Sequence, residues 1–194
     1  MMGNSSGRSV FKRYELMISI LIKIFSVTPR FMQRFIWSFF DCYEGRLSIG
    51  VRYCLLANSV KKCGKNVFIG RGVIFKNIEN LSLGDNISIH AGCYIDAFGG
   101  VNIGDNVSIA HQSSLVSFEH TWADASLPIK YNKTISSGIN ISSDVWIGCG
   151  VRVLDGSEIG QRVIVAAGAV VKGFLDAGCI YGGVPAKKLK KIIA

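Results

Sequence analysis

The 194-residue sequence is 49% hydrophobic and 18% charged, a balance that excludes an intrinsically disordered chain. Its 22 glycines and only 3 prolines exclude a proline-rich linker or collagen. The net charge of +9 is unevenly distributed: residues 1–62 hold ten Lys/Arg and three Asp/Glu (+7), residues 63–185 hold eight and ten (−2), and residues 186–194 hold four and none (+4). No helix-turn-helix, zinc-finger or aromatic RNA-binding pattern accompanies this charge. We therefore expect anionic lipid or a phosphorylated ligand as the partner, and no nucleic acid.

The six cysteines form neither a CxxC pair nor a metal-ligand spacing, so the sequence predicts no bound metal. The segment Met1–Val10 lacks the apolar run and the cleavage site of a signal peptide. Reduced thiols in a cytoplasmic protein are the state that we expect.

Residues 10–40 are apolar and aromatic but are interrupted by basic residues. The longest uncharged stretch, Leu16–Ile22, is far shorter than the roughly 20 residues that a transmembrane helix needs. After a disordered start at residues 1–9, we expect two helices separated near Pro29. Two interpretations stay open: the helices cap the end of the repeat that follows, or they make peripheral contact with the inner face of the cell membrane.

The next region is built on a six-residue step. Aliphatic residues recur at Ile141, Ile147, Val153, Ile159, Val165 and Val171. A period of six fits neither an α-helix nor a plain strand, but it is typical of hexapeptide β-helices. In the strand Val145-Trp146-Ile147 the outer side chains should point inward and the middle one outward. Glycines such as Gly148 would lie at turns that need backbone freedom, as would Gly160. The predicted fold class is an all-β solenoid.

The turns define longer coils. The segments CGKN at 63, LGDN at 83 and IGDN at 103 are 20 residues apart, and coils of 18 begin at Ile141 and Ile159. We predict about five stacked triangular coils over residues 63–185, an N-terminal helical segment at 1–62 and a basic C-terminal tail at 186–194. Residues 121–138 break the six-residue step and are predicted to project as a loop, commonly on the binding face.

Stacking the outward positions predicts three columns. The first column holds Phe68, Ser88, Ser108, Trp146 and Ile164. The second column holds Ile74, Tyr94, Ser114, Arg152 and Val170. The third column holds Asn80, Gly100, His120 and Glu158. This alignment places His120 at the root of the projecting loop, with Glu158 stacked above it.

Three motifs in order carry a resemblance: DVWIG at Asp144–Gly148, IGQRVIVAAGAVV at Ile159–Val171 and GGVPAKKLKK at Gly182–Lys191, preceded by a histidine and a loop. Together they resemble the hexapeptide acyltransferases, a superfamily that includes galactoside, maltose and streptogramin acetyltransferases and the O-acetyltransferases of bacterial surface polysaccharides. The resemblance covers about residues 63–192. It implies a left-handed parallel β-helix, a homotrimer with active sites between subunits, and acetyl-CoA as the acyl donor.

The resemblance also assigns roles to residues. His120, in SFEHTW, matches the catalytic histidine, and a neutral histidine is suited to remove the proton of a sugar hydroxyl as general base. His90 and Trp122 are the weaker candidates for contact with the acceptor. The positions that match cofactor contacts are Trp146, Gly148, Cys149, Ala167, Lys172, Lys187 and Lys190.

We expect an acetyl-CoA-dependent O-acetyltransferase that acts on a sugar hydroxyl of a cell-surface polysaccharide or of its lipid-linked precursor. One alternative is an acetyltransferase for a small molecule, such as a streptogramin-type drug, a free sugar or an amino sugar. A second alternative, from another class, is a non-catalytic β-helix scaffold.

Overall fold

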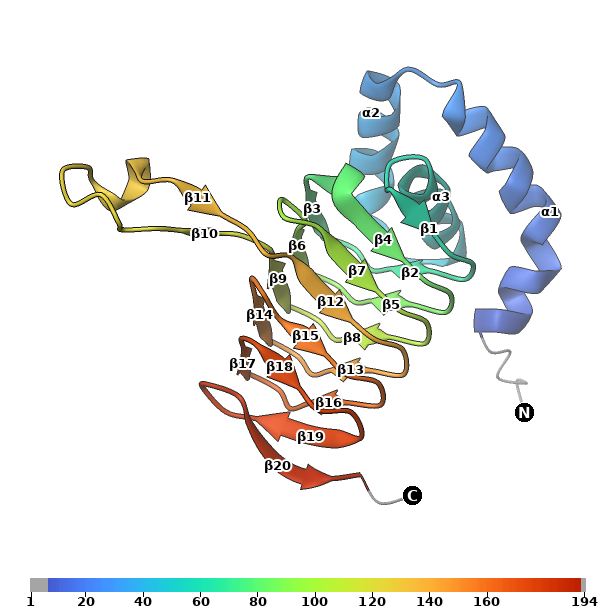
Figure 1. The fold of residues 1–194 in the computed structure, drawn as a ribbon. Helices are drawn as coiled ribbons and strands as arrows, with labels where there is room; N and C mark the ends of the chain where they lie inside the picture. Colours follow the sequence, from blue (N-terminus) through green and yellow to red (C-terminus); the bar gives the residue numbers. More distant parts are fainter. Residues whose placement is uncertain (1–6, 193–194) are drawn as a thin grey trace.

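The computed structural model describes residues 7–192, in which three helices precede a triangular parallel β-solenoid (Figure 1). The helices are α1 (Gly7–Ser26), α2 (Arg30–Asp41) and α3 (Arg46–Ala57). The predicted break near Pro29 is confirmed, whereas α3 was not predicted. Residues 7–9, expected to be disordered, begin α1, and residues 1–6 lie outside the described residues.

The solenoid has three parallel sheets, which we call A, B and C. Sheet A consists of β1 (Lys62–Cys63), β4 (Leu81–Leu83), β7 (Val101–Ile103), β12 (Ile139–Ile141), β15 (Glu158–Ile159) and β18 (Phe174–Leu175). Sheet B consists of β2 (Phe68–Ile69), β5 (Ser88–Ile89), β8 (Ser108–Ile109), β13 (Trp146–Ile147), β16 (Ile164–Val165), β19 (Cys179–Gly182) and the antiparallel β20 (Lys187–Lys191). Sheet C consists of β3 (Ile74–Lys76), β6 (Tyr94–Asp96), β9 (Ser114–Val116), β14 (Arg152–Leu154) and β17 (Val170–Val171).

The solenoid has about six turns, one more than the sequence predicts. Leu83 pairs with Ile103, Ile103 with Ile141, and Ile141 with Ile159, which confirms the predicted coil register. A further turn follows because Ile159 pairs with Leu175, a shorter step than the 18 or 20 residues of the earlier coils. The sequence repeat fades in this last turn, so the count of five was wrong.

The interior is a stack of aliphatic side chains. Val145 and Ile147 are buried and Trp146 between them is 54% exposed, as predicted for a strand with two inward residues. Each fully buried Val or Ile contributes about 1.5–3 kcal/mol, so the repeated columns supply the main driving force for this fold. The reason for Gly148 differs from the expected one: a Cβ there would lie 2.6 Å from the Ala167 nitrogen, so the residue is needed for space.

The first two predicted columns are confirmed, and the third is wrong. Trp146 pairs with Ser108 and Ile164, and Arg152 pairs with Ser114 and Val170. The outward column of sheet A is Lys62, Ser82, Asn102, Asn140, Glu158 and Phe174. His120 does not belong to this column, and Glu158 is not stacked above it. Asn80 and Gly100 each lie two residues before the outward positions Ser82 and Asn102, and His120 lies in the arm. The prediction failed because it placed the two extra residues of each 20-residue coil after the strand of sheet A and not before it.

The helices cover the first coil. Leu56 of α3 is fully buried in the core, and Trp37 of α2 packs edge-on against Phe75. The guanidinium of Arg52, 1% exposed, donates hydrogen bonds to the carbonyl oxygens of Phe40, Tyr43 and Ile69. This buried cation therefore joins α2, α3 and β2. Across residues 7–192 we find no helix with the length and apolar character needed to cross a bilayer.

The basic residues near the C-terminus form a strand. β20 pairs antiparallel with β19, with Gly182 opposite Lys187 and Ile180 opposite Lys190. All five residues of β20 are exposed. Pairing at the end of sheet B therefore orders a segment that the sequence suggested was a tail.

Candidate active site

An antiparallel arm projects from the solenoid between β9 and β12 (Figure 1). It contains β10 (Glu119–His120) and β11 (Thr134–Ile135), with Glu119 opposite Ile135 and His120 opposite Thr134. The 3-10 turn η2 (Ile129–Tyr131) lies at its outer part. The arm therefore begins at Glu119, two residues before the predicted loop, and His120 is part of its first strand.

His120 is exposed at the base of this arm. Its ring lies 6.1 Å from that of Phe118, which in turn lies 5.5 Å from Phe98, so aromatic contacts connect it to the preceding coil. Within residues 7–192 its imidazole has no hydrogen-bond or ion-pair partner. Either ring nitrogen is consequently available to a ligand or to another subunit.

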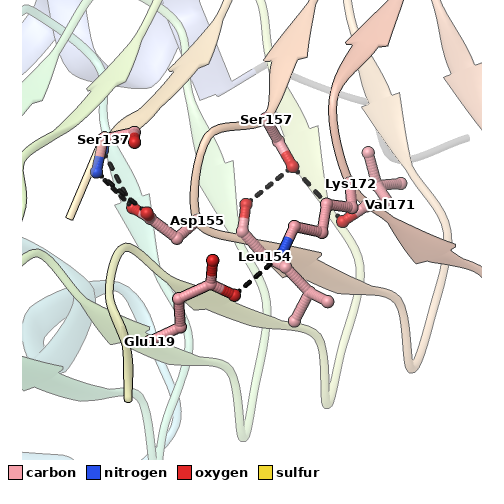
Figure 2. A network of polar contacts seen from close by, with 8 residues as sticks. Glu119, Ser137, Leu154, Asp155, Ser157, Val171 and Lys172 are labelled. Carbon is pink, nitrogen blue, oxygen red and sulfur yellow. Dashed lines mark hydrogen bonds and ion pairs between the residues drawn. The ribbon is translucent and has the colours of Figure 1, made fainter. Parts of the chain in front are cut away.

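A buried carboxylate fastens the returning end of the arm (Figure 2). Asp155 is 5% exposed and accepts hydrogen bonds from the backbone nitrogen of Ser137, at 2.9 and 2.8 Å, and from that of Gly138, at 2.9 Å. Hydrogen bonds to a charged acceptor are the stronger kind, and burial raises the cost of losing them. Asp155 therefore fixes where the arm rejoins the stack.

An ion pair fastens the departing end of the arm (Figure 2). Lys172 Nζ lies 2.7 Å from Glu119 Oε2, next to His120. Nearby, the Ser157 hydroxyl donates to the carbonyl oxygen of Leu154 at 2.6 Å and also lies 3.2 Å from that of Val171. Both ends of the arm are thus attached to coils that follow it in the sequence.

Most predicted cofactor residues lie together on sheet B or at its edge. Trp146 is on β13, and Gly148 and Cys149 follow it at the corner between sheets B and C, which we call the B–C corner. Ala167 lies at the same corner one coil later, and its backbone packs against Gly148. Trp146 and Ala167 are exposed, Cys149 is half-buried, and Gly148 is buried against the next coil. We call these four residues the wall.

The three predicted lysines are divided between two places. Lys187 and Lys190 lie on β20, the outermost strand of sheet B, and therefore extend the wall. Lys172 follows β17 at the corner between sheets C and A, the C–A corner, where its ammonium group contacts the arm. The structure therefore groups Lys172 with His120 and not with the other predicted cofactor residues.

Within one chain, the wall and His120 lie at different corners. Cys149 is at the B–C corner, and Asp155, which holds the arm, is six residues later at the C–A corner. Six residues of extended chain span up to roughly 20 Å at about 3.3 Å per residue. The described chain thus presents the two halves of the predicted site on separate surfaces.

The remaining candidates are scattered. The ring of His90 packs 5.5 Å from that of Phe68, at the B–C corner of an earlier coil. Trp122 is 76% exposed on the arm, close in sequence to His120. His111 lines an open cavity with Arg71, and its carbonyl oxygen accepts a hydrogen bond from the Gly150 nitrogen, at the B–C corner one coil before Cys149. Only Trp122 of these residues shares the arm with His120.

Two residues at the site were missed from the sequence, Asp155 and Glu119. The available signal for Asp155 was positional: it occupies the coil position that Ala97 and Ser117 fill in the two preceding coils. A carboxylate at such an inward corner needs donors, and an arm entering there can supply them. Glu119 carried no comparable signal, because its partner is 53 residues away in the sequence.

A second polar cluster lies one coil before the arm. Asp96, 7% exposed, accepts hydrogen bonds from Asn77 Nδ2 at 2.7 Å and from the Tyr94 hydroxyl at 3.4 Å. Burial, with a smaller contribution from the neighbouring Asp96, raises the pKa of Tyr94. Tyr94 therefore stays protonated as a donor near the arm.

Over the described range 7–192, no group of three His, Cys, Asp or Glu side chains is arranged to hold a metal ion.

Comparisons with known proteins agree with this architecture. The family model for the bacterial transferase hexapeptide (six repeats) matches residues 138–173. A probable acetyltransferase of Mycobacterium tuberculosis is 34% identical over 127 residues, which cover 66% of this chain and 36% of that protein. WbbJ of Escherichia coli, provisionally named a lipopolysaccharide biosynthesis O-acetyl transferase, is 33% identical over 63% of this chain and 62% of its own length. The chain thus spans less than two thirds of either relative.

Solved structures share the fold. A galactoside acetyltransferase in complex with coenzyme A superposes with a TM-score of 0.74 and 26% identity, over 84% of this chain and 80% of that chain. A maltose O-acetyltransferase from Clostridium difficile gives a TM-score of 0.70 at 23% identity, over 96% and 90% of the two chains. The flat six-residue faces are those of the left-handed β-helix. In its repeat, its relatives and its fold, the chain is similar to the hexapeptide-repeat acyltransferases.

Proposed function

We propose that the chain is an acetyl-CoA-dependent O-acetyltransferase for a sugar hydroxyl of a cell-surface polysaccharide or of its lipid-linked precursor. The observation that carries the proposal is the position of His120, at the base of an arm that Asp155 and Lys172 attach to later coils. The name of WbbJ supports the acceptor class. The coenzyme A complex of the galactoside acetyltransferase supports the donor.

His120 would act as general base. One ring nitrogen takes the proton of the acceptor hydroxyl while the hydroxyl oxygen attacks the thioester carbonyl carbon. The new C–O bond forms, the C–S bond breaks, and the proton passes to the departing sulfur of CoA. General-base catalysis of this kind contributes about 10²- to 10⁴-fold to the rate. Trp122, on the same arm, and His90 are proposed to contact the acceptor.

The wall would hold the donor. Its exposed indole, Trp146, and the close packing of Gly148 on the next coil leave an open, rigid surface for an extended ligand. Cys149 and Ala167 would lie along the pantetheine arm. Lys187 and Lys190, on the exposed strand β20, would attract the phosphate groups.

The active site would form between subunits of a homotrimer. A base must come within hydrogen-bond distance of the hydroxyl, yet His120 and the wall are on different corners of one chain. A neighbouring subunit can bring its wall to the arm. The arm also exposes large apolar side chains that such a neighbour would cover: Trp122, Leu127, Ile129, Tyr131 and Ile135.

A lipid-linked acceptor would be met at the membrane. Residues 10–40, which form most of α1 and most of α2, are the segment proposed to make this peripheral contact at the inner face. The proposed location is therefore the cytoplasm, with part of the population on the membrane surface.

The test of the base compares His120→Ala with Lys76→Ala, an exposed residue of the first coil outside the proposed site. We expect His120→Ala to lower acetyl transfer by about 10²-fold or more, with CoA affinity unchanged by calorimetry. Lys76→Ala should behave as the unaltered protein. Near-normal turnover of His120→Ala would remove this residue as the base. Acetyl groups that persist on the cell's glycans when the gene is deleted would refute the proposed acceptor class.

A complementation experiment tests the shared site. His120→Ala lacks the base. The Lys187→Ala/Lys190→Ala double variant should lose more affinity for CoA than for dephospho-CoA, because the lysines are proposed to attract the phosphate groups. When the two are co-expressed and assayed at limiting acetyl-CoA, mixed trimers contain sites with an intact base and an intact wall. We expect activity above that of either variant alone. No recovery in a demonstrably mixed oligomer would place the whole site within one chain.

A further inference from the structure

The outward faces of α1 and α2 carry an unusual share of the exposed apolar surface. Of the 23 large hydrophobic residues that are exposed within residues 7–192, nine lie on α1 and α2. Isolated exposed apolar residues are common, but a concentration of this kind marks a surface that contacts another phase or molecule. The helical cap thus has an outer side that its packing on the solenoid does not explain.

Helix α1 is apolar on two opposite sides. Its inner side, centred on the buried Ile18, packs on the core. Its outer side presents Leu16, Ile20 and Ile24, which are 77%, 50% and 51% exposed. Steps of four residues place these three side chains on one helical stripe. The stripe is not needed to attach α1 to the solenoid.

Helix α2 repeats this arrangement with aromatic residues. Phe31, Phe35 and Phe39 follow one another at steps of four and are 73%, 75% and 54% exposed. Trp37, on the other side of the helix, makes the contact with Phe75 of the first coil. Aromatic side chains on the outer face of an amphipathic helix are typical of helices that lie at a membrane–water interface.

The charges beside these stripes are positive and unpaired. Arg13 and Lys23 have no side-chain ion pair or hydrogen bond to any residue in the range 7–192. Arg30 and Arg34 do not belong to this border, because they line the cavity between α2 and the first coil together with Trp37. The acidic residues of the two helices are engaged elsewhere, since Glu15 pairs with Lys65, and Asp41 accepts a hydrogen bond from the Gly72 nitrogen. The outer face is therefore apolar with an unbalanced cationic border.

We propose that this face, the outer stripes of α1 and α2 with the cations Arg13 and Lys23, docks on an anionic lipid bilayer. Such a surface complements both the acyl region and the negative head groups of the membrane. A second copy of the chain fits it less well, because a symmetric contact would bring two cationic borders together without an acidic partner. The inference specifies the membrane contact of the proposed function and does not depend on acetyl transfer.

The test uses the full-length protein and sedimentation with two kinds of vesicle, phosphatidylcholine alone and phosphatidylcholine mixed with phosphatidylglycerol. We expect binding to the mixed vesicles, with weaker binding as the salt concentration rises. The variant Arg13→Glu/Lys23→Glu should bind the mixed vesicles at least about 25-fold more weakly, because each lost cation accounts for roughly fivefold. Phe31→Ser/Phe35→Ser should weaken binding at least about tenfold.

Matched variants on the solenoid serve as controls. Phe174→Ser removes an aromatic residue that is 66% exposed at the other end of the solenoid, and Lys62→Glu/Lys76→Glu reverses two exposed lysines. Both controls should bind vesicles as the unaltered protein does. His120→Ala should also bind normally, which separates this inference from the catalytic proposal.

Two results would overturn the inference. One is equal vesicle binding by the helix variants and the controls, with unchanged thermal unfolding of every variant. The other is a change of oligomeric state in Phe31→Ser/Phe35→Ser without vesicles, measured by analytical ultracentrifugation, which would assign the face to contact between copies.

Discussion

The two halves of the proposed site lie on segments that differ in how many strand pairings support them: the arm at residues 119–138 and the coils at residues 139–182. Each strand of these coils pairs with a neighbouring coil, as β13 does with both β8 and β16, and its inward side chains are buried. The arm has one short ladder of its own, formed by β10 and β11. The proposed base is thus on the least supported segment, and the proposed donor surface is on the best supported one.

The comparison shows how a regular scaffold can position an irregular segment. The arm does not rely on its own two-strand ladder, because such hairpins are marginal in isolation. It relies on Asp155 and Lys172, which belong to the regular coils. Contacts with the rigid coils therefore hold the base of the arm, and with it His120, in a fixed position.

The largest expected effect is on the coils. In Gly148→Ala, the new Cβ would lie 2.6 Å from the Ala167 nitrogen and 2.7 Å from the Val165 oxygen, both of which are backbone atoms that cannot move aside. We expect the free energy of unfolding to fall by about 3 kcal/mol, measured by urea denaturation. Gly50→Ala is the matched control: its Cβ would meet no atom within 4 Å, and alanine in helix α3 should add up to about 1 kcal/mol. Equal effects of the two substitutions would contradict the close approach at Gly148.

The next effect is on the arm. Asp155→Ala removes the acceptor of the Ser137 and Gly138 nitrogens, so we expect a loss of about 2 kcal/mol in the free energy of unfolding. The more specific readout is limited proteolysis, in which cleavage should appear within residues 119–138 and the coils should stay intact. Asp155→Asn keeps one carbonyl oxygen as an acceptor, so its arm should be cleaved more slowly than that of Asp155→Ala. An arm as resistant as that of the unaltered protein would show that Asp155 is not its anchor.

The pair of Lys172 and Glu119 should contribute less. Both side chains are substantially exposed, at 54% and 40%, and solvent screens such pairs. A double-mutant cycle with Lys172→Gln and Glu119→Gln should give a coupling of about 1 kcal/mol or less. Calorimetry with CoA sharpens the assignment: weaker binding by Lys172→Gln alone would support its proposed second role at the cofactor. Equal CoA affinity in both variants would restrict Lys172 to the arm.

The smallest effect concerns the last strand of sheet B. The Lys188 ammonium donates a hydrogen bond to Asp176, which raises the pKa of Lys188 above its ordinary value of 10.5. Because the folded-state pKa is raised, the contribution of this contact is present below pH 10.5 and is lost as the pH rises through the folded value. NMR titration of the lysine side chain should show this raised pKa, and Asp176→Asn should lower the pKa of Lys188. A Lys188 that titrates identically in both proteins would exclude the contact.

The sequence predicted the coils well for a physical reason. Val145, Trp146 and Ile147 alternate between inside and outside, and Ile103, Ile141 and Ile159 fall into register, because one local pattern of burial is repeated in every coil. Candidate residues on this regular part, such as Trp146 and Ala167, were consequently placed together. The count of coils failed where the pattern fades, after Ile159.

The sequence by itself determined the solenoid, the inward and outward faces of its strands and the existence of an interruption, since each follows from spacing along the chain. Only the tertiary structure decided that β20 closes sheet B, that His120 lies outside the outward column of sheet A, and that Asp155 and Lys172 hold the arm. These features depend on contacts between segments that are distant in sequence, 18 residues apart for Asp155 and Ser137 and 53 for Lys172 and Glu119. Periodicity constrains residues that repeat, whereas such contacts arise only when the stacked coils bring single, non-repeating side chains together.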